Sequence, residues 1–169
     1  MTEAVMSEEF VERRGGKYLT FFLGEEEYGL EILKVQEIIG LMGITPVPRT
    51  PEFIRGVINL RGKVIPVIEL RLKFGLVTVE ETSETCIIVV QIEGISVGLV
   101  VDRVSEVTDI LDEEVEDTPS FGADVDTDYI LGIGKSGERV RMLLDIERVL
   151  EVEELVHLSQ KETEAEFAS

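Results

Sequence analysis

The run from Pro51 to Arg71 constrains the fold more than any other segment, because it predicts a β-hairpin. Two apolar strands flank the turn Asn59-Leu60-Arg61-Gly62. Gly62 supplies the positive φ that such a tight reversal needs. Arg61 contributes nothing to a core from the tip of an apolar hairpin, so its guanidinium is free to meet a carboxylate or a partner protein. A solvated turn residue is the alternative interpretation.

Charge and composition exclude several classes of function. The chain has 169 residues, and 35 acidic side chains face 16 basic ones, for a formal charge of −19. Nucleic acids and anionic membranes are bound through clustered Lys and Arg, so we expect neither as a partner. No apolar run approaches the roughly 18 to 20 residues of a membrane span. The single cysteine, Cys86, cannot form an internal disulfide, which fits a cytoplasmic location.

The N-terminal half predicts a leader, strands and one short helix. We expect residues 1–16 to form a disordered leader that ends at a glycine pair and precedes an aromatic-rich strand. Over 32–39, Ile32, Val35 and Ile39 recur at helical spacing, which predicts a short helix. Prolines then indicate an extended connector that leads into the hairpin.

The C-terminal half predicts a second set of strands that begins at Thr85. The acidic segment 112–128 is expected to form a long loop. Asp145 is placed to cap a short helix over 146–150, because an aspartate carboxylate accepts hydrogen bonds from the first free amides of a helix. We expect a C-terminal helix and a frayed tail over 151–169.

The sequence contains an internal echo. Segment 28–38 aligns with segment 97–107, and glycine, leucine, valine and glutamate residues match identically between them. The later hairpins also correspond, with Gly56 matching Gly132. Short, evenly spaced strands with glycine turns favour small barrels over open sheets. We therefore expect two similar small β-barrels that derive from a duplication.

Catalytic and metal-binding motifs are absent or incomplete. Three aspartates have the alternate spacing of a calcium loop: Asp124, Asp126 and Asp128. Tyr129 and Lys135 stand where that motif requires glycine and glutamate. The only histidine, His157, and the only cysteine provide neither a nucleophile–base pair nor a soft metal cluster. We expect no enzymatic activity, no cofactor and no metal, and we keep a cation site at 124–128 as an unfavoured alternative.

Three segments of the chain together resemble the CheW family of bacterial adaptors, which couple chemoreceptors to the histidine kinase CheA. They are the hairpin around Asn59-Leu60-Arg61-Gly62, the run Lys34-Val35-Gln36-Glu37-Ile38-Ile39 and the run Gly98-Leu99-Val100-Val101-Asp102-Arg103-Val104. The resemblance covers residues 17–150. It implies a mainly β fold of two packed five-stranded SH3-like β-barrels, with a short helix after the first strand pair and a C-terminal helix. The barrels are expected over about 17–78 and about 83–147.

The resemblance also implies partners and the residues that contact them. The expected receptor-binding residues are Val35, Glu37, Ile38, Asn59, Leu60, Arg61 and Val104. The expected kinase-binding residues are Ile44, Thr45, Pro46, Val47 and Gly56. A turn also needs prolines and a glycine, and Val104 also fits a plain core position. We expect Glu37 and Arg61 to form an ion pair that links the short helix to the hairpin.

The implied function is a non-catalytic signalling adaptor. Its expected partners are the regulatory domain of CheA and the cytoplasmic tips of chemoreceptors. The expected location is the cytoplasm, with recruitment to membrane receptor arrays through protein contacts. A CheW-like scaffold for a kinase pathway outside chemotaxis is the second interpretation.

Overall fold

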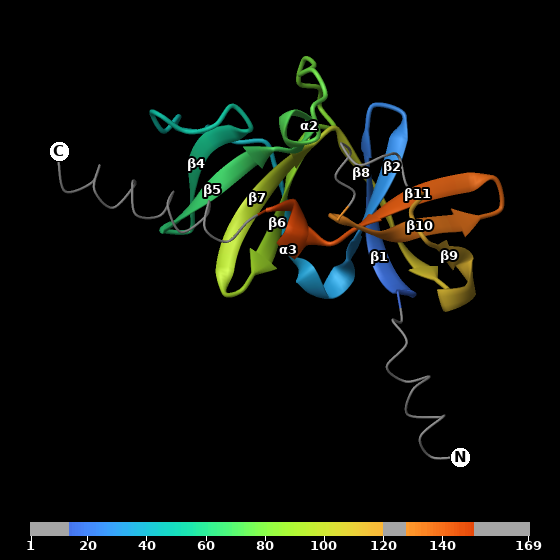
Figure 1. Ribbon diagram of the computed structural model, residues 1–169. Coiled ribbons are helices and arrows are strands. Elements are labelled where there is room, and N and C mark those ends of the chain that lie inside the picture. Colours follow the sequence, from blue (N-terminus) through green and yellow to red (C-terminus); the bar gives the residue numbers. More distant parts are fainter. Residues whose placement is uncertain (1–13, 120–127, 151–169) are drawn as a thin grey trace.

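Within residues 14–119 and 128–150, which the computed structural model describes, the chain forms two β-sheets that lie next to each other (Figure 1). The expected mainly β fold is therefore confirmed. The first sheet has six strands in the order β8 (Arg103–Ile110), β1 (Gly16–Leu23), β2 (Glu26–Glu31), β11 (Arg139–Leu144), β10 (Ile130–Ser136), β9 (Val115–Glu116). The second has five in the order β3 (Val35–Gly40), β6 (Cys86–Ile92), β7 (Ile95–Val101), β5 (Lys63–Glu69), β4 (Ile54–Leu60).

Each sheet takes strands from both halves of the chain. The chain crosses from the first sheet to the second after β2, and it crosses back after β7. The expected division into barrels over 17–78 and 83–147 does not match this pairing, because β3, β4 and β5 join β6 and β7 rather than β1 and β2. Strand pairing is set by contacts that are distant in sequence, so the linear order of strands predicts it poorly.

The two sheets are built to the same plan. If each strand is replaced by its counterpart in the other half, the order β3-β6-β7-β5-β4 becomes β8-β1-β2-β11-β10, and β9 is the additional strand. Matching registers support the equivalence: Val35 pairs with Val90 as Val104 pairs with Phe21. Both sheets also contain one parallel contact, β5 with β7 and β2 with β11. The duplication inferred from the sequence therefore agrees with the fold, and its two halves have exchanged strands.

The expected helix over 32–39 is wrong in most of its length. Only the 3-10 turn η1 (Ile32–Lys34) is helical, and β3 follows at Val35. Burial along β3 alternates between half-buried and exposed side chains, as it does on an edge strand. In so short a segment the apolar residues fit both the helical period of 3.6 residues and the strand period of two. The β-branched side chains of valine and isoleucine favour the strand.

Other local expectations can be compared with the structure. Residues 14–16 are ordered rather than part of a leader, since the Arg14 side chain donates to Leu131 O and Gly16 begins β1. The expected loop over 112–128 instead begins with the 3-10 turn η2 (Asp112–Glu114) and β9. Asp145 caps α3 (Ile146–Val149), as expected, by accepting from the backbone N–H of Glu147.

The remaining expectations lie outside the described residues. They concern the leader over 1–13, the aspartates at 124 and 126, and the C-terminal helix and tail over 151–169. The segments that the structure describes contain no helix long and apolar enough to cross a bilayer.

The largest hydrophobic cluster joins the two sheets. Its fully buried members include Phe21 and Leu30 of the first sheet and Ile88 and Leu99 of the second. Four stacked aromatic rings extend it, with centroid separations of 5.2 to 5.6 Å: Phe21, Tyr28, Phe74 and Tyr129. Burial of this area is the main force that holds the sheets together. Phe74, a member of this stack, comes directly after the short helix α2 (Leu70–Lys73), which follows β5 in the chain.

Candidate protein-interaction site

The turn between β4 and β5 holds Arg61 away from the protein body. Arg61 and Gly62 have φ values of 53° and 84°, and positive φ at both central positions is the geometry of a type I′ hairpin turn. The side-chain Oδ1 of Asn59 accepts the N–H of Gly62 at 2.8 Å and closes the turn. The Arg61 side chain is 69% exposed as a result.

Glu37 on β3 meets this arginine. Arg61 Nη2 lies 2.6 Å from Glu37 Oε1 and 2.7 Å from Oε2, so one nitrogen contacts both carboxylate oxygens. The expected ion pair is therefore confirmed, although Glu37 belongs to a strand rather than a helix. The contact therefore links β3, at one edge of its sheet, to the turn that follows β4, the strand at the other edge.

The space beside the ion pair is hollow and polar. A cavity of about 230 Å³ is lined by Leu60, Arg61 and the apolar Ile65 and Val89, together with three polar residues that are not among the expected site residues: Gln36, Lys63 and Ser96. Ser96 Oγ donates to Gln36 Oε1 at 2.9 Å, and Lys63 Nζ lies 3.4 Å from Ser96 Oγ. The serine within an otherwise apolar strand was the available signal for this network.

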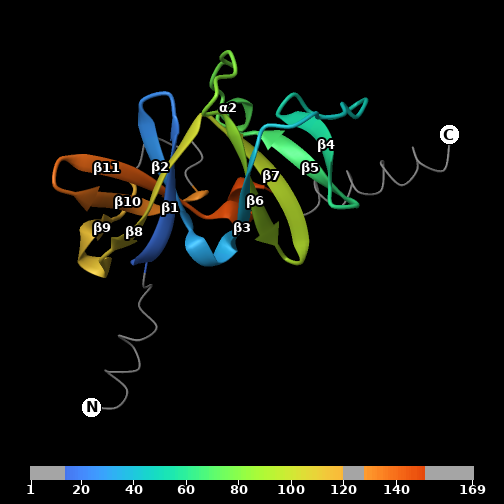
Figure 2. The same cartoon turned by 180° about the vertical axis from the view of Figure 1, so that it is seen from behind.

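The remaining expected receptor residues lie on the two strands that follow the crossings. Val35 on β3 and Val104 on β8 are half-buried and pack against the same large hydrophobic cluster. Ile38 points outward and is 45% exposed. Figure 2 shows β3 in cyan on one sheet and β8 in yellow on the other. Val35 and Val104 thus lie at the same cluster from opposite sheets, while Asn59, Leu60 and Arg61 lie at the hairpin turn.

The expected kinase residues form one backbone-locked segment. Thr45 and Val57 exchange two backbone hydrogen bonds of 2.9 Å, which join the connector after β3 to β4. Gly56 has a φ of 141°, and a Cβ there would lie 2.0 Å from Thr45 O. Only glycine permits this approach. Ile44 and Val47 are half-buried, while Thr45 and Pro46 are exposed.

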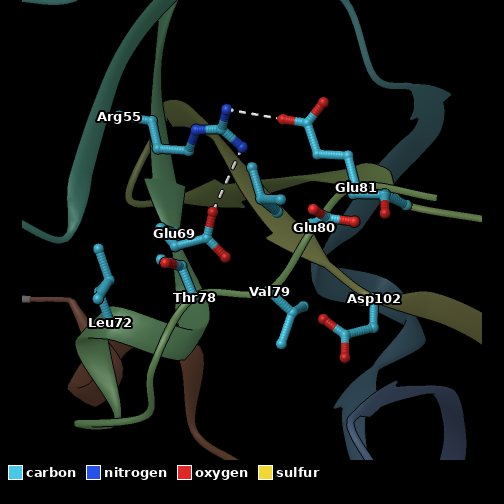
Figure 3. Close-up of a pocket in the computed structure, with 10 residues that line it drawn as sticks. Arg55, Glu69, Leu72, Thr78, Val79, Glu80, Glu81 and Asp102 are labelled. Atoms are coloured by element: carbon cyan, nitrogen blue, oxygen red, sulfur yellow. Dashed lines mark hydrogen bonds and ion pairs between the residues drawn. The ribbon is translucent and has the colours of Figure 1, made fainter.

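A separate cavity of about 300 Å³ lies between β4, β5 and the 78–85 segment (Figure 3). Arg55 crosses it, with Nη1 3.3 Å from Glu69 Oε2 and Nη2 2.9 Å from Glu81 Oε1. Burial raises the pKa of Glu69 above its ordinary value, and the Arg55 charge opposes that change. The cavity is lined by the ion-paired carboxylates of Glu69 and Glu81 and by apolar side chains such as Leu72 and Val79. In the described part of the chain, no three His, Cys, Asp or Glu side chains are grouped to hold a metal.

The fold and the site together define a class of protein: a mainly β domain made of two strand-exchanged repeats, with exposed side chains positioned on strand edges and a hairpin turn. Comparisons with known proteins identify the family. The family model described as "CheW-like domain" matches residues 17–154, and this chain belongs to that family.

Individual relatives agree with the family assignment. The chain is 45% identical to the chemotaxis protein CheW of Klebsiella aerogenes, over 83% of this chain and 85% of that protein. It is 37% identical to the chemotaxis protein CheW of Helicobacter pylori, over 79% and 81%. Among solved structures, the scaffolding protein TtCheW of Thermoanaerobacter tengcongensis matches with a TM-score of 0.74 and 39% identity, covering 81% of this chain and 93% of that one.

Proposed function

We propose that the protein is a non-catalytic signalling adaptor that couples the cytoplasmic tips of chemoreceptors to the regulatory domain of CheA. Relatives that match most of its length are named chemotaxis proteins, and a solved relative is named a scaffolding protein. The protein acts in the cytoplasm and reaches membrane receptor arrays through its protein partners. It needs no cofactor, because its task is to hold two proteins together.

The observation that carries the receptor assignment is the contact between Glu37 and Arg61. It joins β3 to the hairpin turn, so two segments far apart in sequence form one surface. Exposed Ile38, next to Glu37 on β3, adds apolar area to it, and half-buried Val35 and Val104 lie at the hydrophobic cluster between the sheets. A surface with apolar contacts and one oriented ion pair suits a folded protein partner, for which a few central contacts dominate affinity. The receptor tip binds along β3 and β8 and contacts the turn residues Asn59, Leu60 and Arg61.

The kinase assignment rests on the segment locked by Thr45 and Val57. Its backbone is fixed before any partner arrives, which lowers the entropic cost of binding. Ile44, Pro46, Val47 and the neighbouring Gly56 contact the CheA regulatory domain. In this proposal the kinase domain contacts the segment at Thr45 while the receptor contacts the Glu37–Arg61 pair, so both partners bind at once.

A titration with each partner tests this function. A purified receptor cytoplasmic fragment and the CheA regulatory domain are each added to the intact protein and to Arg61→Ala. Lys135→Ala is the matched control, since Lys135 is an exposed, ion-paired cation on the hairpin of the other repeat. We expect the wild type and the control to bind both partners, and Arg61→Ala to lose only the receptor. The proposal is contradicted if the wild type fails to bind the receptor fragment or fails to bind the CheA regulatory domain.

A scaffold for a kinase pathway outside chemotaxis remains the second interpretation from the sequence. The names of the matching relatives favour chemotaxis. Binding of the protein to a sensor kinase of another pathway, and not to CheA, favours the second interpretation.

A further inference from the structure

The two crossings between the sheets lead directly to the strands of the proposed receptor site. After β2, the chain passes through η1 into β3, which begins at Val35. After β7, it passes through Asp102 into β8, where Val104 follows within two residues. The relative placement of β3 and β8 therefore depends on how these crossings are held.

Asp102 is the centre of a polar junction at the second crossing. Its carboxylate accepts from Arg71 Nε at 2.8 Å and from Arg71 Nη2, and it also accepts the backbone N–H of Gly24 at 2.6 Å. Arg71 lies on α2, which follows β5 of the second sheet, whereas Gly24 lies in the turn between β1 and β2 of the first sheet. The Asp102 carboxylate thus links the helix that follows β5 of the second sheet to the β1–β2 turn of the first sheet.

The junction is largely shielded from water. The Arg71 side chain is 10% exposed and that of Asp102 is 23% exposed. The remaining Arg71 nitrogen, Nη1, donates to Val77 O at 3.1 Å, so the guanidinium uses each of its nitrogens. Hydrogen bonds from Arg71 hold the pKa of Asp102 below its ordinary value. Charged hydrogen bonds with this geometry are stronger than neutral ones and restrict orientation.

The first crossing has a weaker counterpart. Lys34 Nζ, at the end of η1, lies 2.8 Å from Glu147 Oε1 on α3. By the alignment of the later hairpins, Glu147 occupies the position equivalent to Arg71. Here the charges are reversed, both side chains are more than a third exposed, and a single nitrogen makes the contact. Exposed pairs of this kind contribute little.

We propose that Arg71 and Asp102 are positioning residues that set β8 and Val104 against β3, and thereby shape the receptor-binding surface. This inference rests on the proposed function for its consequence in binding. Its geometric part, the placement of one sheet relative to the other, is a property of the free protein.

Distances between two spin labels test the inference on the full chain. Cys86→Ala removes the native thiol, and labels are attached at Gln91→Cys on β6 of the second sheet and at Glu138→Cys in the turn between β10 and β11 of the first, both exposed. Asp102→Asn is compared with Glu147→Gln, the matched change at the weaker crossing. Asp102→Glu tests rescue by a carboxylate. Arg71→Lys, which keeps the charge but lacks the guanidinium contacts, replaces Asp102→Asn if that variant does not fold. Receptor-fragment affinity is measured on the same proteins.

We expect Asp102→Asn to shift or broaden the distance distribution and to weaken receptor binding about tenfold. Glu147→Gln should leave both unchanged, and Asp102→Glu should restore part of each. A distance distribution of Asp102→Asn that superimposes on the wild type overturns the inference. If the distances change but the wild type binds no receptor fragment, the proposed function fails while the positioning role stands.

Discussion

Glu37 and Glu106 occupy equivalent positions in the two repeats, and each contacts an arginine of the hairpin that follows in its own repeat. Glu37 meets Arg61 at 2.6 and 2.7 Å, and Glu106 Oε1 lies 3.3 Å from Arg141 and 3.4 Å from Arg139. The environments differ, because the Arg61 side chain is 69% exposed and that of Arg141 only 5%. A glutamate–arginine contact therefore lies on an exposed surface in one sheet, whereas in the other it includes the buried Arg141 beside the half-exposed Glu106 and Arg139.

This contrast predicts unequal costs for two similar substitutions. Arg61→Ala should lower the free energy of unfolding by about 0 to 1 kcal/mol, since exposed ion pairs contribute little. Arg141→Ala should lower it by about 1 to 3 kcal/mol, because buried Glu27, 3.2 Å from Arg141 Nε, would lose one of its two arginine partners and keep only Arg139. Urea unfolding of both variants measures the difference. Equal losses would mean that Arg61 is a structural residue.

Acid should destabilise the fold partly through Asp102. Hydrogen bonds from Arg71 lower its pKa, so the folded protein binds fewer protons at this carboxyl than the unfolded chain does. The stabilisation is fully present above the ordinary pKa of about 4 and is lost as the pH falls through the lowered value. Glu69 acts in the opposite direction, because burial raises its pKa.

The measurement is the free energy of unfolding between pH 7 and pH 3. We expect the wild type to lose stability more steeply below about pH 4 than Asp102→Asn does, because the variant lacks the titrating group. Parallel curves for the two proteins would show that Asp102 is not a source of the acid sensitivity.

Gly56 should not tolerate a side chain. Its positive φ and the approach of Thr45 O to 2.0 Å from a Cβ predict that Gly56→Ala costs about 2 to 4 kcal/mol in unfolding free energy. Gly43→Ala is the control, since nothing lies within 4 Å of a Cβ there. Thermal unfolding of both variants gives the comparison, and a Gly56→Ala protein as stable as the control would contradict the described contact.

A charge at Val47 should separate the two proposed partners. Val47→Glu puts a carboxylate at a half-buried position of the segment locked by Thr45, and the contact between Glu37 and Arg61 does not include Val47. We expect at least about tenfold weaker binding of the CheA regulatory domain, with receptor-fragment binding unchanged. Isothermal titration with each partner measures both affinities. Equal loss of both would argue against a separate kinase surface.

Local chemistry in the sequence predicted local features of the structure. The hairpin turn, the Glu37–Arg61 pair and the Asp145 cap each depend on a few neighbouring residues or on one matched pair of charges. The echo between segments 28–38 and 97–107 likewise corresponds to equivalent registers in the two sheets.

The longer-range arrangement was not predictable in the same way. Exchange of strands between the repeats leaves each strand with the same local pattern, so the sequence does not distinguish exchanged from consecutive pairing. The sequence does not distinguish β3 from a helix, because Val35 and Ile39 are four residues apart and share one face in either structure. The Arg71–Asp102 junction joins residues separated by two strands, and neither side chain stands out in its own segment.

The adaptor claim is tested most directly by asking whether the protein bridges its two partners. A receptor cytoplasmic fragment is immobilised, and capture of the CheA regulatory domain is measured with and without the protein. Arg61→Ala and Val47→Glu serve as variants that each lose one partner. We predict that the wild type recruits the kinase domain and that neither variant does. If the wild type binds each partner alone but recruits no kinase domain to the receptor, the two sites exclude each other and the adaptor account is wrong.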